Sequence, residues 1–238
     1  MADSLEDLIM LQPPTAERPL LGTIVLVVED SRHACEVLRL ICQRSGARIR
    51  RAESLASAER HLRTYRPRIA VIDLGLPDGS GLDLIECLSR PESGIDGIIA
   101  MSGDDTLQEA ALQAGADVFL AKPLVSVSHF QTVALQLLPA ELRPVRVAKP
   151  ITDSIEPDPV ALRDDLALAA DLLRTDPDTA TIDYVGGFLA SLGKDAGDSA
   201  LINLADMVRS INIAGAGGVQ PSEAANAVED RMKDLQPV

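Results

Sequence analysis

Between Gly22 and Leu138, five short apolar segments alternate with five segments of helical periodicity. The apolar segments are "TIVLVV", "ARIRR", "RIAVID", "DGIIAM" and "DVFLA", of which "ARIRR" is the weakest. The expected helices lie at 31–44, 54–65, 79–90, 105–115 and after Pro123. Strands that alternate with helices run parallel, and Val- and Ile-rich strands without polar alternation are buried on both faces. We therefore predict an α/β domain with a doubly wound, five-stranded parallel sheet.

Polar side chains follow the apolar segments at the positions where the strands are expected to end. Glu29 and Asp30 follow the first strand, and Asp73 ends the third. Ser102 ends the fourth strand, and Lys122 follows the fifth. In an open parallel sheet the carboxyl ends of the strands form one rim, where ligands bind. We expect these five side chains to meet on that rim.

Carboxylates gathered on one rim repel one another. Two unit charges at ~4 Å and an effective dielectric constant near 20 repel by about 4 kcal/mol. Without a cation between them, the three carboxylates would raise one another's pKa, and Lys122 supplies only one positive charge. Oxygen ligands with room for water suit Mg²⁺ better than a softer metal. We predict that Glu29, Asp30 and Asp73 form a magnesium site.

Residues 22–138 resemble the receiver domain of bacterial two-component response regulators. The resemblance rests on the Glu29-Asp30 pair, the "DLGLPDGSG" segment from Asp73, the Ser-Gly at 102–103 and the Lys-Pro at 122–123, in that order. It implies a flavodoxin-like sheet with strand order 2-1-3-4-5. It also implies that Asp73 accepts a phosphoryl group from a phosphohistidine on a histidine kinase or phosphotransfer protein. Such a domain catalyses only its own phosphorylation and dephosphorylation.

The same resemblance implies the ligands of the metal. Asp30 and Asp73 would bind Mg²⁺ directly, together with the backbone carbonyl of Gly75. Glu29 would hold the ion through water. Phosphoryl transfer depends on positioning and charge neutralisation, which a divalent ion and a lysine supply.

Three further residues take roles from the resemblance. Lys122 would contact the phosphoryl oxygens, placed by Pro123 through a cis peptide. Ser102 would hydrogen-bond a phosphoryl oxygen and draw its loop inward, which makes it a switch residue. Phe119 stands where the family keeps a switch aromatic, and without a hydroxyl it must act by packing alone.

Two positions depart from the family's commonest pattern, and two alternatives stay open. Gly75 has no side chain beside Asp73, and Asp104 places another carboxylate near the phosphoryl group. The domain could be an inactive scaffold that only binds partners. A haloacid dehalogenase-like phosphatase is disfavoured, because it needs an aspartate two residues after its nucleophile, where this chain has Gly75.

The rest of the chain is predicted to be an N-terminal extension (1–21), a Pro-rich linker (139–159) and an acidic helical module (160–238). Four helical patterns occupy the module, with N-caps expected at Asp158, Asp178, Asp198 and Ser222. Residues 1–150 hold 16 Lys and Arg against 20 Asp and Glu, and residues 151–238 hold 6 against 16. The two parts therefore carry net charges of −4 and −10. An acidic module is a poor partner for nucleic acid phosphates.

We expect the helical module to act in protein–protein interaction or homodimerisation. One hypothesis is that it docks on its own receiver or on a second copy through the nine arginines of residues 39–68. No histidine follows His129, so the module is not a histidine phosphotransfer domain. The alternatives are a DNA-binding transcriptional regulator and a receiver that only drains phosphate from a kinase.

Nothing in the sequence predicts a membrane protein. No apolar stretch approaches the ~20 residues that a membrane span requires. The three cysteines show no paired spacing, and the first residues are acidic where a secretion signal is basic. We therefore predict a cytoplasmic protein.

Overall fold

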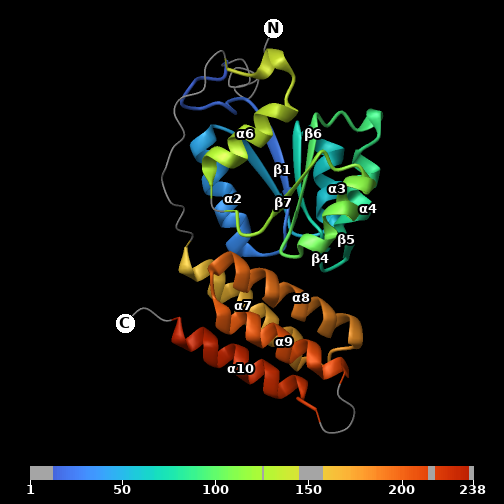
Figure 1. The fold of residues 1–238 in the computed structure, drawn as a ribbon, viewed down its shortest axis with the longest axis vertical. Helices are drawn as coiled ribbons and strands as arrows, with labels where there is room; N and C mark the ends of the chain where they lie inside the picture. Colours follow the sequence, from blue (N-terminus) through green and yellow to red (C-terminus); the bar gives the residue numbers. More distant parts are fainter. Residues whose placement is uncertain (1–12, 125, 145–157, 214–217, 236–238) are drawn as a thin grey trace.

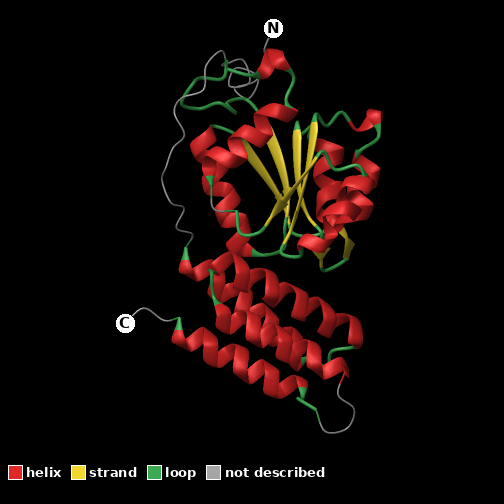
Figure 2. Cartoon of the chain, in the orientation of Figure 1, coloured by secondary structure: helices red, strands yellow, loops and turns green. Residues whose placement is uncertain are grey.

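The computed structural model describes residues 13–124, 126–144, 158–213 and 218–235. Its main sheet contains β1 (Ile24–Val28), β2 (Arg48–Ala52), β3 (Ile69–Asp73), β6 (Gly97–Ser102) and β7 (Val118–Ala121). All neighbouring strands are parallel, in the order β2-β1-β3-β6-β7 (Figures 1 and 2). This is the predicted flavodoxin-like order 2-1-3-4-5, which is confirmed. The weakest predicted strand, β2, lies at one edge.

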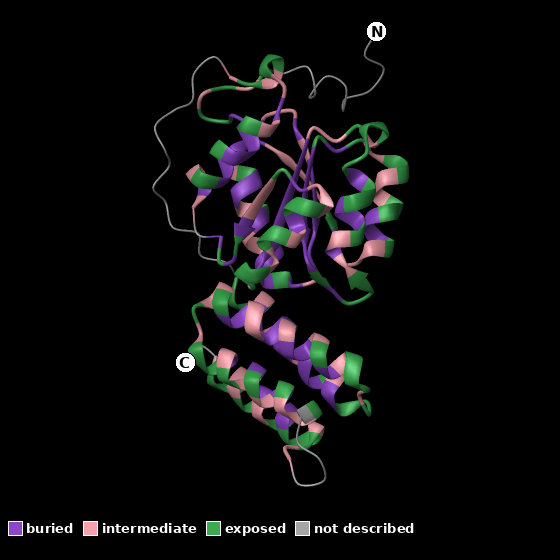
Figure 3. Ribbon diagram, turned by 45° about the vertical axis from the view of Figure 1, so that its right-hand side comes forward, coloured by how far each residue is buried: buried purple, intermediate pink, exposed green. Residues whose placement is uncertain are grey.

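Helices cover both faces of the sheet. On one face lie α2 (Arg32–Ser45) and α6 (Val127–Leu137), and on the other α3 (Leu55–Thr64), α4 (Gly81–Leu88) and α5 (Gln108–Ala114). Successive side chains of a strand point to opposite faces. In β1, Val25 and Val27 join the first core, whereas Leu26 and Val28 join the second. The three central strands β1, β3 and β6 are therefore buried on both sides (Figure 3), which explains their apolar sequences.

Several boundaries differ from the sequence expectation. Helix α2 begins at Arg32, because the side chain of Ser31 caps it by accepting a hydrogen bond from the backbone N–H of Ala34. The segment expected to start a helix at residue 79 first forms a hairpin of β4 (Gly75–Leu76) and β5 (Gly79–Ser80). Three short 3₁₀ helices were not predicted: Pro91–Ser93, Asp105–Leu107 and Ala140–Leu142.

Four helices follow the receiver half: α7 (Pro159–Arg174), α8 (Thr179–Ala196), α9 (Ser199–Ile213) and α10 (Pro221–Asp234). Asp158 and Asp178 cap α7 and α8 as predicted, and Asp198 accepts a hydrogen bond from the backbone N–H of Ala200. The prediction for Ser222 is wrong. The N-cap of α10 is Gln220, two residues earlier, and the helix begins at Pro221, because proline is pre-organised for the first helical position.

The helical module has a core of its own, centred on residues such as Leu166, Val185 and Leu189. Gly186 allows α8 and α9 to approach closely, since a Cβ there would lie 2.7 Å from Cγ of Arg209. The "YVGGF" segment is thus part of a packed helix. Most of the predicted linker (145–157) and the joint after α9 (214–217) lie outside the described residues.

The module lies against the rim formed by the carboxyl ends of the strands (Figure 1). Helices α7 and α8 contact α2, and α8 also contacts β4. Two domains distant in sequence therefore meet at the rim where the sequence predicts a ligand site. Among the described helices, none is both long and apolar enough to cross a membrane.

Candidate functional site

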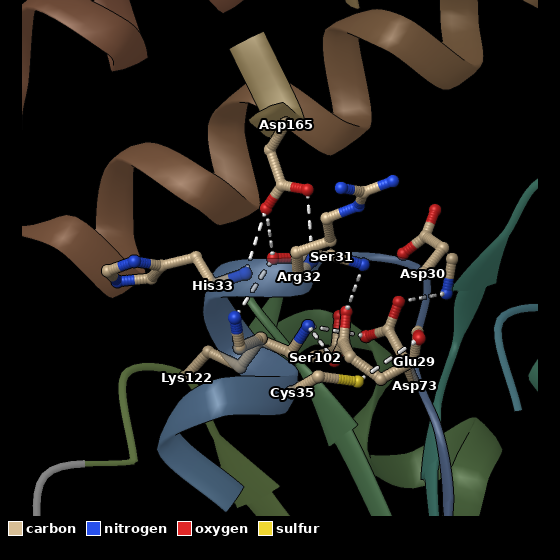
Figure 4. A network of polar contacts seen from close by, with 12 residues as sticks. Glu29, Asp30, Ser31, Arg32, His33, Cys35, Asp73, Ser102, Lys122 and Asp165 are labelled. Atoms are coloured by element: carbon tan, nitrogen blue, oxygen red, sulfur yellow. Dashed lines mark hydrogen bonds and ion pairs between the residues drawn. The ribbon is translucent and has the colours of Figure 1, made fainter. Parts of the chain in front are cut away.

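The five polar side chains predicted to meet on the rim do lie together (Figure 4). Glu29 and Asp30 follow β1, Asp73 ends β3 and Ser102 ends β6. Lys122 follows β7 and reaches across the rim, with its Nζ 2.6 Å from Oε2 of Glu29 and 3.0 Å from Oδ1 of Asp73. The Lys122–Pro123 peptide is cis, as the resemblance implied. One ammonium group thus bridges two carboxylates from different strands.

Burial governs the charges at this centre. Glu29 is 2 % exposed, Lys122 5 % and Asp73 7 %. Burial raises the pKa of Glu29 well above its ordinary value, and the nearby Lys122 only partly offsets this. Burial alone would lower the pKa of Lys122, but the carboxylates of Asp73 and Glu29 raise it well above its ordinary value. Lys122 therefore stays positively charged and holds the two carboxylates together.

Three carboxylates are placed to share a cation. One oxygen from each of Glu29, Asp30 and Asp73 lies within 4.8 Å of the others. Gly75 lines the same cavity, and its backbone N–H donates to Oδ2 of Asp73 at 3.2 Å. This all-oxygen set fits a hard divalent cation rather than a soft metal. The three predicted carboxylate ligands are thus gathered at one point.

The remaining predicted residues surround this centre. Ser102 is buried, and its Oγ accepts a hydrogen bond from the backbone N–H of Asp104 at 3.0 Å. The carboxylate of Asp104 caps the following turn by accepting from the backbone N–H of Thr106. Phe119 is half-buried against the core beneath α4 and α5. A switch role for Ser102 or Phe119 stays a prediction.

A tyrosine of the helical module reaches into the site. The hydroxyl of Tyr184, on α8, donates to Oδ2 of Asp30 at 2.5 Å. Burial raises the pKa of Asp30 to about 6, although this hydrogen bond acts to lower it. A predicted metal ligand of the receiver is therefore held by a side chain from the module.

An aspartate of α7 binds the N-terminus of α2, next to the metal centre (Figure 4). Asp165 accepts hydrogen bonds from Oγ of Ser31 at 2.9 Å and from the backbone N–H groups of Arg32 and His33 at 2.9 and 3.0 Å. It is 1 % exposed, and burial raises its pKa despite these bonds. A buried carboxylate at a helix N-terminus compensates the positive end of the helix dipole.

Two more residues of α8 approach the receiver. Lys194 donates a hydrogen bond from Nζ to the backbone carbonyl of Gly103. Burial raises the pKa of Asp195 to about 6, while the nearby Lys122 acts to lower it. The module therefore adds both a cation and an acid to the surroundings of the site.

A cavity of about 500 Å³ lies between the two domains. From the receiver, Asp73, Lys122, Ser102 and the Glu29-Asp30 pair line it. From the module it is lined by Asp183, Tyr184, Gly187, Phe188, Ala190, Ser191, Lys194, Ile202 and Arg209. The receiver site is thus a pocket with a wall made by α8 and α9.

One hypothesis from the sequence was that the helical module docks on its own receiver or on a second copy through the arginines of residues 39–68. The ion pairs of Arg39, Arg63 and Arg68 are with Glu36, Glu59 and Asp96 of the receiver half. The docked face instead uses Arg32, which pairs with Asp164 at 2.5 Å, and the start of α2. The docking contact at the start of α2 therefore involves Arg32 rather than Arg39, Arg63 or Arg68.

Sequence reasoning missed Tyr184, Asp165, Lys194 and Asp195. One signal was available for Asp165, which stands at helical spacing beside Leu162, Leu166 and Ala169 on the apolar stripe of α7. A carboxylate on such a stripe requires a buried hydrogen-bonding partner. The sequence offers no comparable signal for Tyr184, because its partner lies 154 residues away.

Replacing Tyr184 with phenylalanine should raise the pKa of Asp30 above about 6, because the ring keeps the site buried while the hydrogen bond to the carboxylate is lost. Asp30 would then keep its proton to a higher pH. Carboxyl-carbon NMR titration in metal-free buffer measures this shift. Tyr65→Phe, at the chain's other tyrosine, is the matched control and should leave the titration of Asp30 unchanged.

Comparison with known proteins finds similarity over the part of the chain that contains Asp30, Asp73 and Lys122. Residues 25–133 match the family model described as the response regulator receiver domain. The protein is similar to the KDP operon transcriptional regulatory protein KdpE of Escherichia coli K12 (35% identity over 101 residues) and to the transcriptional regulatory protein PhoP of E. coli O157:H7 (37% over 101 residues). Each match covers 42% of this chain and 45% of the relative.

Among solved structures, the fold is similar to the receiver domain of sensor histidine kinase PA1611 from Pseudomonas aeruginosa PAO1, which was solved with a magnesium ion in its active site cleft. The identity is 23% and the TM-score 0.44, and the match covers 48% of this chain and 96% of that chain.

Proposed function

Because residues 25–133 are a response regulator receiver domain, we propose that this chain is a two-component response regulator phosphorylated on Asp73. The observation that carries the proposal is the contact of Lys122 with both Asp73 and Glu29, beside Asp30 and Ser102. The proposed donor is a phosphohistidine on a histidine kinase or phosphotransfer protein. The domain would catalyse only its own phosphorylation and dephosphorylation.

Each side chain has a defined part in this reaction. An oxygen of Asp73 forms the new bond to phosphorus, and the electron pair of the broken bond stays with the leaving group. Lys122 neutralises charge on the phosphoryl oxygens, and the hydroxyl of Ser102 donates to one of them. A magnesium ion held by Glu29, Asp30, Asp73 and the Gly75 carbonyl would supply further positive charge. The added group carries roughly −1.5 to −2 charges, enough to reorder neighbouring hydrogen bonds.

The helical module is proposed as the output element, acting through protein contacts. Its docking on the receiver supports this, because Tyr184 and Asp165 connect the module to the segment that carries Asp30. A change of charge at Asp73 is therefore adjacent to the docked surface.

The names of KdpE and PhoP favour a second candidate, regulation of transcription through DNA binding. The charge of the module argues against it, since Arg174, Arg231 and Lys233 pair with Glu229, Asp198 and Asp230 inside the module. Basic groups neutralised in this way release few counterions from DNA. A gel-shift assay at low salt separates the two candidates, and salt-dependent binding would favour the second.

Incubation with Mg²⁺ and acetyl phosphate should add the mass of one phosphoryl group to the intact protein. Asp73→Asn should abolish the gain because the amide is not a nucleophile. Asp83→Asn, at an exposed carboxylate of α4, is the matched control and should be phosphorylated like the wild-type chain. Intact-protein mass spectrometry makes the measurement, and an unchanged mass gain in Asp73→Asn would contradict the proposal.

A further inference from the structure

The position of the helical module raises the question of which phosphoryl donors can reach Asp73. The Asp73 side chain is 8 % exposed in the docked chain. The cavity beside it is bounded on the receiver side by the rim and on the other side by α8 and α9. Any donor must therefore enter a space that the chain itself partly fills.

Helix α8 packs directly on the loop after β6, at Gly103. A Cβ on Gly103 would lie 3.3 Å from Cα of Ser191, which is tighter than ordinary van der Waals contact. Lys194 donates to the carbonyl of the same glycine. A helix with its side chains is ≈ 10–12 Å across, so a donor histidine presented on a helix would compete with α8 for the space at this loop.

The module is fastened at the other side of the site by Asp165. Its carboxylate accepts three hydrogen bonds at the start of α2, from Ser31, Arg32 and His33. Asp165 is only 1 % exposed, so all three hydrogen bonds are made to a buried carboxylate. Hydrogen bonds to a charged group are stronger than those between neutral groups. The Arg32–Asp164 pair lies at the exposed edge of the same contact. Asp165 is thus the latch of the docked state.

We propose that the docked helical module is a size filter over the phosphorylation site: it admits small phosphorylated molecules, such as acyl phosphates, and excludes a phosphohistidine carried by a protein. The inference rests on the proposed function of Asp73. In the docked state only small donors react with Asp73. A protein donor reacts only after the module has left the rim. A cavity of about 500 Å³ has room for a small acyl phosphate.

The transfer from a small donor balances without a further reactant. The bond between phosphorus and the acyl oxygen breaks, and a bond between phosphorus and an oxygen of Asp73 forms. The electron pair of the broken bond stays on the leaving carboxylate, and no proton is transferred. Lys194 and Arg209 line the side of the cavity that the module forms, and their positive charges attract the anionic donor.

The size filter is tested with a substitution at Asp165 that breaks the contact between the module and α2, while the residues around Asp73 stay unchanged. Asp165→Arg places a cation against the positive end of α2 and should release the module. Asp171→Arg, at an exposed position of the same helix, makes the same change of charge away from the contact and is the control. Circular dichroism checks that each variant is folded, and hydrogen exchange of residues 29–34 reports release of the module independently of phosphorylation.

Two donors are compared in magnesium buffer: acetyl phosphate, and a folded histidine phosphotransfer protein carrying phosphohistidine. For Asp165→Arg we expect faster exchange at 29–34, a rate with the protein donor at least about tenfold above wild type, and a rate with acetyl phosphate within about threefold. Asp171→Arg should match the wild-type chain throughout.

The filter is wrong if Asp165→Arg reacts with the protein donor no faster than the wild-type chain. It is also wrong if release of the module raises the phosphorylation rate equally with both donors, since the module would then not discriminate by size. If no variant takes a phosphoryl group on Asp73 from either donor, the proposed function itself fails, which is a different result.

Discussion

Replacing Lys122 with methionine should lower the free energy of unfolding by about 3–5 kcal/mol in metal-free buffer at neutral pH. The ammonium group contacts Glu29 and Asp73 with a side chain only 1 % exposed, so its removal leaves buried carboxylates without their cation. Urea denaturation with a chelator present measures the loss. Phosphorylation of Asp73 should be lost as well.

The decrease in the free energy of unfolding that Lys122→Met causes should become smaller as the pH falls. The pKa of Glu29 is already raised by burial, and removing the nearby ammonium raises it further. A carboxyl whose folded pKa lies above its unfolded pKa stabilises the protein while it keeps its proton and loses that contribution as the pH rises through the folded pKa. Lys233→Met, at an exposed lysine of α10, is the control and should have little effect. Equal urea midpoints for wild type and Lys122→Met would show that Lys122 does not hold the site together.

Replacing Gly81 with alanine should lower the free energy of unfolding by about 1–3 kcal/mol or more, the second largest effect that we expect. A Cβ at this position would overlap the backbone carbonyl oxygen of Asp73 and would also lie 3.0 Å from Cα of Leu74. Both neighbours are backbone atoms, so the helix or the strand end must move. Urea denaturation reports the stability, and the phosphorylation rate with acetyl phosphate reports the displacement of Asp73.

The matched control for this substitution is Gly187→Ala, in α8. Apart from its chain neighbours and the nearby backbone of its own helix, no atom lies within 4 Å of a Cβ at that position. Alanine therefore adds helix propensity without a clash and should raise the free energy of unfolding by up to about 1 kcal/mol. A wild-type phosphorylation rate in Gly81→Ala would mean that the close approach of α4 does not position Asp73.

The receiver half of the fold was predictable because its signals are local. The segments around Val27, Val71 and Ile99 are apolar throughout, and each is buried on both faces of the sheet. Parallel strands have their carboxyl ends on one rim, so residues that follow different strands had to meet. The Lys122 contacts with Glu29 and Asp73 join residues 93 and 49 positions apart, yet strand order alone brings them together.

The helical module was predictable as helices but not as a neighbour of the site. Periodicity shows which face of α8 is apolar, whereas the partner of Tyr184 depends on how two domains pack. The arginine-rich segment 39–68 suggested a charged contact, but a buried carboxylate bound by backbone N–H groups forms the latch instead. Net charge describes long-range attraction, while docking geometry depends on single desolvated groups. The β4–β5 hairpin and the start of α10 at Pro221 were missed for a simpler reason, since turn and cap signals shift boundaries by a residue or two.

Reductive trapping of the phosphorylated protein tests the central claim most directly. Borohydride reduces an aspartyl phosphate to an alcohol, and peptide mass spectrometry then identifies the residue. After incubation with Mg²⁺ and acetyl phosphate, the account predicts the alcohol at Asp73 alone. Its appearance at Asp30 or Asp195, or at no aspartate, would contradict the account.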